Sequence, residues 1–118
     1  MDRLNTTPGS TYETLSQETI VVVLSEMGRS PYINRTDGKD HWPYTSMMLI
    51  GPGVAGGTTV GAYDDSFVGV PTHPQTGVVD EAAGPLLPDT LGATLLALGG
   101  VDPEAELPGS AVLEPVLA

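Results

Sequence analysis

The run from Thr19 to Leu24, made of β-branched and aliphatic residues, most constrains what this chain can fold into. A strand without polar alternation is typical of a sheet that is covered on both faces, and such sheets are mostly parallel or mixed, with helices on each side. They need several strands joined by crossover connections. The sequence therefore predicts an α/β fold, with this strand inside a mixed sheet flanked by helices.

The rest of the chain offers few elements that could enclose such a strand. A second strand is expected at 46–50 and a third at 56–63, although glycine weakens strands. Leucines at helical spacing, with Pro88 before them and two glycines after them, predict a helix over 88–98. Three short strands and one helix are too few, so the sheet is expected to be incomplete on its own.

The expected organisation is a single partial domain over 1–118. Residues 1–17 are polar and predict a surface loop with a short helical piece near 12–15. The remainder, 18–118, is expected to be either the C-terminal part of a larger α/β domain or a subunit that completes its sheet with a partner.

The charge of the chain argues against some classes of partner. Fifteen acidic residues against four basic ones give a formal net charge of −11, whereas nucleic acids and anionic membranes require clustered Lys and Arg. No apolar run approaches the roughly 20 residues that span a bilayer. With no cysteine, a metal site would have to use carboxylate, imidazole, hydroxyl or water.

The few basic residues are unevenly placed. Arg29, Arg35 and Lys39 lie close together, only Arg3 lies elsewhere, and no base follows. Local positive potential is therefore expected only around 29–39, where it would favour an anionic ligand near His41. The plainer interpretation of the net charge is a solvated acidic surface.

Several residues after the first strand could carry chemistry. If that strand is central, Glu26 emerges at the carboxyl end of the sheet, where ligands bind in α/β folds; otherwise it is an acid bonded to loop amides. Asp40 and His41 could bind a metal, but adjacent side chains of an extended segment point to opposite sides. Arg29 could bind a sulfate or phosphate, or form a salt bridge with one of the many carboxylates. His73 is expected to be an exposed loop residue without a role.

The order of the motifs resembles one family. The stretches "VVVLSEMGRSPYIN", "GKDHWPYTSMMLIGPGVAGGTTVGAYDD" and "LLPDTLGATLLALGGVDP" are similar to the C-terminal region of bacterial sulfatase-like proteins of unknown function in the alkaline phosphatase superfamily. The similarity covers about 19–109. Departures from the pattern, such as Met27 for an aromatic residue and Lys39 for arginine, remove no expected ligand.

The resemblance implies a metal-dependent hydrolase-type fold of the alkaline phosphatase kind. It implies Glu26, Asp40 and His41 as ligands of a divalent metal (Zn, Mn, Mg or Ca), and Arg29 and Lys39 as contacts to an anionic small-molecule or glycan ester. It also implies a missing N-terminal half with the nucleophile, so the chain alone is not expected to be a competent enzyme. Periplasmic or extracellular localisation follows by resemblance only.

Three functions are consistent with the sequence. The first is the C-terminal fragment of a metal-dependent sulfatase or phosphatase-like hydrolase. The second is a non-catalytic binding or surface protein that keeps the fold without the chemistry. The third is a truncated reading frame with no separate function.

Overall fold

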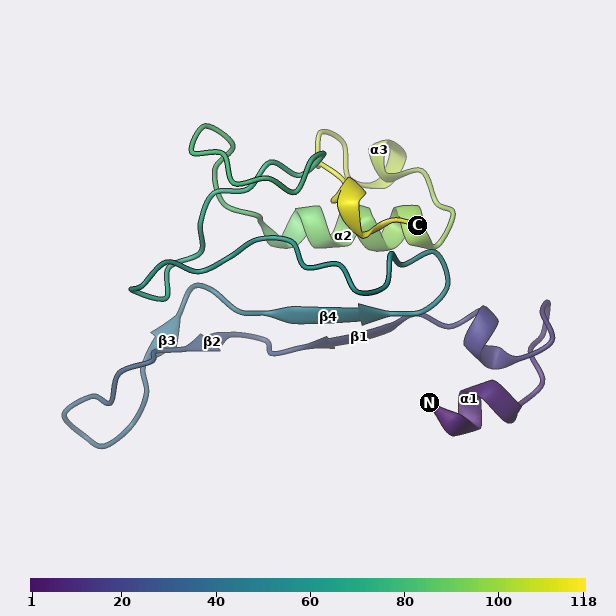
Figure 1. The fold of residues 1–118 in the computed structure, drawn as a ribbon, viewed down its shortest axis with the longest axis horizontal. Coiled ribbons are helices and arrows are strands. Elements are labelled where there is room, and N and C mark those ends of the chain that lie inside the picture. Colours follow the sequence, from purple (N-terminus) through teal and green to yellow (C-terminus); the bar gives the residue numbers. More distant parts are fainter. The chain divides into compact units, whose positions relative to one another are not determined.

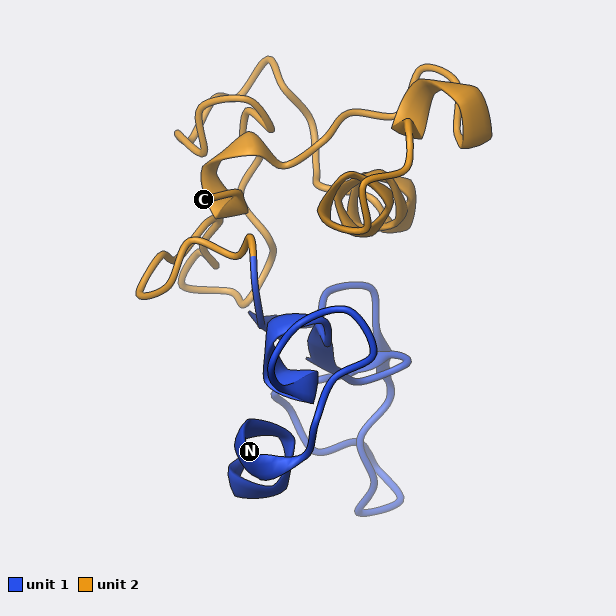
Figure 2. Ribbon diagram, turned by 90° about the vertical axis from the view of Figure 1, so that its right-hand side faces the viewer, with its two compact units in different colours: residues 1–52 blue, residues 53–118 orange.

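The computed structural model describes residues 1–118, and the chain divides into two compact units (Figures 1 and 2). Unit 1 comprises 1–52 and unit 2 comprises 53–118. Both β-sheets belong to unit 1, and the longest helix belongs to unit 2. The single partial domain expected over 1–118 therefore contains two separately packed parts.

Unit 1 is built around one long antiparallel hairpin. β1 (Val21–Leu24) pairs with β4 (Met47–Ile50), and β2 (Gly28–Arg29) pairs with β3 (His41–Trp42). Since β2 follows β1 and β3 precedes β4, the two ladders are successive parts of the same ribbon, joined at the far end by the loop 30–40 (Figure 1). The strands expected near 19–24 and 46–50 are thus present, but as an antiparallel pair.

The two ladders differ in register. Three residues, 25–27, separate β1 from β2, whereas four, 43–46, separate β3 from β4. The returning strand therefore carries one extra residue, as in a β-bulge, which lets the ladder resume beyond an irregular stretch. The residues expected to form a site lie in and beyond this interruption.

The expectation that the first strand is buried on both faces is wrong. Val23 and Leu24 are 49% and 52% exposed, and Met47 and Met48 opposite them are 45% and 53% exposed. The reason is topological, since β1 and β4 form an antiparallel two-stranded sheet, which has no crossover connection to bring a helix onto each face. Its apolar composition is therefore not explained by burial within the ribbon.

The first 18 residues hold helical structure at places other than the expected one. α1 spans Asp2–Thr6 and the 3₁₀ helix η1 spans Leu15–Gln17. The side chain of Thr14 accepts from the Gln17 amide, and the Gln17 side chain accepts from the Thr14 amide, so η1 begins with a reciprocal capping box. The helical piece expected near 12–15 lies instead at Leu15–Gln17.

Unit 2 contains α2 (Pro88–Leu98), α3 (Pro103–Glu106) and the 3₁₀ helix η2 (Glu114–Val116). The helix predicted over 88–98 is confirmed with the same bounds, because proline suits the first helical position and glycine the stop. The strand predicted at 56–63 is wrong. Gly57 and Gly61 have φ of 74° and 80°, left-handed values that interrupt an extended strand.

The C-terminal tail holds unit 2 together. Thr94, in the middle of α2, is buried; its Oγ1 donates to the Thr90 carbonyl at 2.6 Å and accepts from the Leu113 amide at 2.9 Å. Farther along, the Ala55 amide donates to the Val116 carbonyl at 2.8 Å. The tail therefore bonds both the helix and the start of the unit.

The architecture is a small mixed α/β one with two small antiparallel sheets and few helices. It supports the α/β class but gives no support to the finer expectation, a portion of an alkaline-phosphatase-like sheet between helices. No helix has both the length and the apolar character needed to cross a membrane.

Candidate functional site

Arg29 and His41 are brought together by the β2–β3 ladder. They are direct partners in the antiparallel register, so their side chains leave the same face of the ribbon. The Ser30 amide donates to the Asp40 carbonyl at 2.9 Å, which makes that neighbouring pair the hydrogen-bonded one. Arg29 and His41 are therefore a non-hydrogen-bonded pair, the type in which the side chains lie closer together.

Gly28 allows the strands to approach at the base of this pair. A Cβ atom at this position would overlap the backbone oxygen of Tyr44. The "GR" dipeptide therefore combines a residue that must lack a side chain with one whose guanidinium is exposed. Glycine is a common choice wherever two backbones come this close.

The loop beyond the pair is organised by Asn34. Its Oδ1 accepts from the Thr36 amide at 3.0 Å and from the Gly38 amide at 2.9 Å, and its Nδ2 donates to Asp40 Oδ1 at 2.8 Å. Asp37, at φ 57°, completes the turn in the left-handed region. Sequence reasoning missed Asn34, although an Asn followed three residues later by Asp-Gly is a turn signal that could have found it.

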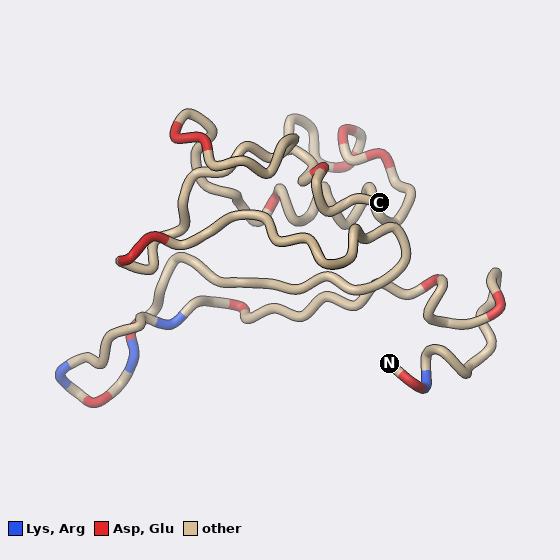
Figure 3. Tube along the Cα trace, viewed as in Figure 1, with Lys and Arg blue, Asp and Glu red and all other residues tan.

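Three of the chain's four Lys and Arg residues lie in this hairpin, and the fourth, Arg3, lies in α1 (Figure 3). Arg29, Arg35, Lys39 and His41 are all exposed to solvent. The Arg29 Nη1 donates to the Lys39 carbonyl at 3.4 Å, which draws the guanidinium along the ribbon toward the loop. A guanidinium presents several donors in one plane and suits the oxygens of phosphate, sulfate or carboxylate.

Of the residues expected to bind a metal, Asp40 and His41 are consecutive, whereas Glu26 lies on the other strand of the hairpin. Glu26 is exposed in the irregular stretch after β1, His41 is in β3, and Asp40 is bonded to Asn34 in the loop. No group of three or more His, Cys, Asp or Glu side chains is arranged to hold a metal ion. Metal binding by Glu26, Asp40 and His41 therefore stays a prediction.

His73 was expected to be exposed, and the structure shows it partly buried. It belongs to unit 2, its side chain is partly buried, and its Nδ1 is buried without a hydrogen-bond partner. Its backbone starts a tight turn, accepting from the Gly77 amide at 2.8 Å. We assign it no part in the hairpin site.

One carboxylate outside the hairpin has a perturbed acidity. The backbone amide of Ser10 and then that of Thr11 donate to Glu18, and these bonds lower the pKa of its carboxyl below the ordinary value of 4.5. The Thr11 bond is 3.0 Å long. Because this carboxylate closes the 10–18 loop, its role is structural.

Comparison with known proteins gives one match. Residues 12–111 match the family model described as "Protein of unknown function (DUF1501)". No curated protein and no solved structure matches the chain. The matching family is one of unknown function, so the identification with sulfatase-like proteins of the alkaline phosphatase superfamily is wrong. Because the match covers most of its length, the chain belongs to the DUF1501 family.

Proposed function

We propose that this chain binds an anionic group, of the phosphate or sulfate kind, on the face of the β2–β3 ribbon that carries Arg29 and His41. The observation that carries the proposal is their direct cross-strand pairing in the one basic segment of an acidic chain. Arg29 would supply a planar pair of donors, and His41 an imidazole donor beside it. Lys39 adds charge from the adjoining loop.

The electrostatic context favours selective binding at this place. Unit 1 holds all four basic residues with six carboxylates, whereas unit 2 holds nine carboxylates and no Lys or Arg. An anion is therefore repelled by most of the chain, and the hairpin is the region where the potential changes. Screening limits the repulsion to about a Debye length, roughly 8 Å at physiological salt.

Hydrolysis of the bound ester is the more specific function that belongs to the same proposal. It would require a nucleophile from another part of the protein or from a partner subunit. A divalent metal at Glu26, Asp40 and His41 would also have to assemble on binding. A non-catalytic binding role needs neither addition, and we take it as the simpler form of the proposal.

Titration with inorganic phosphate and with sulfate, followed through backbone amide shifts in NMR, tests the binding. We expect the largest shifts at the amides flanking Arg29 and His41. Arg29→Gln should weaken binding about tenfold, because it removes a charged hydrogen-bond donor. Arg3→Gln removes the same charge from α1 and should leave binding unchanged. Equal weakening by both variants would show nonspecific attraction and overturn the proposal.

A separate measurement addresses the hydrolytic form. Calorimetric titration with Zn²⁺ or Mn²⁺ should give saturable binding that Glu26→Gln and His41→Ala both abolish. Absence of saturable binding, with phosphate binding retained, would remove the metal-dependent reaction and leave the anion-binding function intact.

A further inference from the structure

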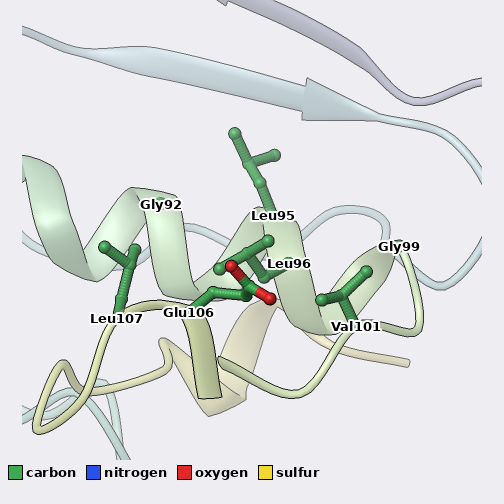
Figure 4. A pocket seen from close by; sticks show the side chains of 7 residues that line it. All are labelled: Gly92, Leu95, Leu96, Gly99, Val101, Glu106 and Leu107. Carbon is green, nitrogen blue, oxygen red and sulfur yellow. The ribbon is translucent and has the colours of Figure 1, made fainter. Parts of the chain in front are cut away.

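An apolar groove lies in unit 2 between α2 and α3. It has a volume of about 500 Å³ and is lined by residues of both helices and of their connection: Gly92, Leu95, Leu96, Gly99, Val101, Glu106 and Leu107 (Figure 4). A Cβ at Gly92 would lie 3.0 Å from Leu107 Cδ1, so the glycine lets the end of α3 pack close to α2. Glu106 is the one charged side chain of the lining.

The absence of Lys and Arg from unit 2 constrains the charge of a molecule that could occupy the groove. None of the residues 53–118 is Lys or Arg, so the unit has no ammonium or guanidinium group to pair with the exposed Glu106. An occupant that covers the apolar lining also removes water from this carboxylate, which costs free energy unless a positive group replaces the water. The groove therefore suits a segment that combines apolar side chains with Lys or Arg.

The chain itself contains a segment of this chemistry. The loop 30–40 at the end of the β2–β3 ribbon, here called the hairpin arm, exposes Tyr32 and Ile33, each to 61%. Arg35 and Lys39, also exposed, follow in the same loop (Figure 3). Bonds to Asn34 fix the loop before any contact is made, which lowers the entropic cost of docking.

We propose that the hairpin arm of one copy docks in the α2–α3 groove of a second copy. Tyr32 and Ile33 would cover the leucines of the groove, and Arg35 would pair with Glu106. This contact uses the tip of the hairpin, whereas the anion site lies at its base, so the inference does not depend on the proposed function.

The net charge of −11 opposes self-association, so the strength of self-association should depend on the salt concentration. Repulsion between whole chains acts over distances that salt screens, whereas a partly desolvated ion pair within the groove is screened much less. Association should therefore strengthen from low salt to about 0.15 M, at which the Debye length is roughly 8 Å.

Sedimentation of the full chain over a range of concentrations tests the inference. We expect reversible association that Glu106→Lys and Arg35→Glu each weaken about tenfold or more. An equimolar mixture of the two variants should recover association, because the groove of the Glu106→Lys copy then meets the arm of the Arg35→Glu copy with opposite charge. Ile33→Ser should also weaken association without changing any charge.

The controls match each charge change. Glu114→Lys alters another exposed carboxylate of unit 2, and Arg3→Glu alters a base outside the arm; both should leave association unchanged. Far-UV circular dichroism confirms that each variant keeps its fold. A monomer at every concentration, equal effects of Glu114→Lys and Glu106→Lys, or a crosslink between 35 and 106 found only within one chain would each overturn the inference.

Discussion

The two units are held together by different kinds of interaction. Unit 1 depends on a backbone ladder, a glycine at a close approach and side chains that bond loop amides, and its only buried residue is Ser30. Unit 2 is packed around α2, where Ala93 and Thr94 are buried and the C-terminal tail bonds the helix. Unit 1 therefore gains its order from local geometry, and unit 2 from one helix and its tie to the tail.

The two units also differ in net charge. With four bases against six carboxylates, unit 1 is close to neutral, while unit 2 has nine carboxylates and no Lys or Arg. A two-stranded ribbon is marginal in water by itself, so the ordering of the basic hairpin rests on a few specific contacts. Removing those contacts one at a time tests whether the two units are independent.

Gly28→Val should have the largest effect, and only in unit 1. The new side chain would overlap the Tyr44 backbone oxygen, so the strands must separate, at a cost of about 3 kcal/mol. Hydrogen exchange should show loss of protection at the Ser30 amide, which donates to Asp40, and no change at the Leu113 amide of unit 2.

Gly38→Ala is the matched control for this substitution. The nearest atom to a Cβ at Gly38 is Asn34 Oδ1 at 3.5 Å, an ordinary contact, so protection at Ser30 should persist. If exchange at Leu113 also accelerates in Gly28→Val, the two units unfold as one and the comparison between them fails.

Thr94→Val should have the next largest effect, and only in unit 2. The substitution keeps the side-chain shape but leaves the Leu113 amide without its acceptor, for a loss of about 2 kcal/mol. Hydrogen exchange at Leu113 and the midpoint of thermal unfolding measure it. Thr58→Val, at an exposed position, should change neither. Equal loss from both variants would mean that the tail bond does not hold the unit together.

The elements that the sequence predicted correctly are those whose own residues determine them. The apolar run ending at Leu24, the second run ending at Ile50 and the proline-to-glycine bounds of α2 each specify an element by their own residues. The partner of the first strand was predicted wrongly, because apolar composition indicates burial without identifying what covers the strand. The exposure of Val23 and Leu24 shows this difference directly.

The residues of the candidate site could be named from the sequence, but their pairing across the ribbon could not. The crowding of rare residues between Arg29 and His41 was visible in the sequence, but their pairing depends on a two-residue ladder that no periodicity reveals. A register offset of one residue lies between this ladder and the next, and it could not be read from propensity. The expected set of Glu26, Asp40 and His41 rested on a resemblance rather than on geometry, and the structure does not gather the three into a metal-binding group.

Asn34→Ala should have a smaller effect, confined to the hairpin arm. The Thr36 and Gly38 amides and the Asp40 carboxylate lose their partner, but water replaces much of it at this exposed loop, so about 1 kcal/mol is expected. Faster exchange at the Gly38 amide measures the loss. Asn5→Ala, in α1, should leave this amide unchanged. Loss of the Arg29–His41 ladder in Asn34→Ala would show that the loop, rather than Gly28, sets the ribbon.

The smallest effect is expected from Glu18, and it depends on pH. Because the folded pKa lies below the ordinary value of 4.5, the folded chain binds fewer protons than the unfolded chain between the two values, and stability rises with pH there. The contribution is complete above about 4.5 and is lost as the pH falls through the lowered pKa. Glu18→Gln should remove this part of the pH dependence and leave the exchange of Ser30 and Leu113 unchanged at pH 7. Glu13→Gln, an exposed neighbour, is the control, and an identical acid profile in both variants would show that the amides of Ser10 and Thr11 do not hold the loop through charge.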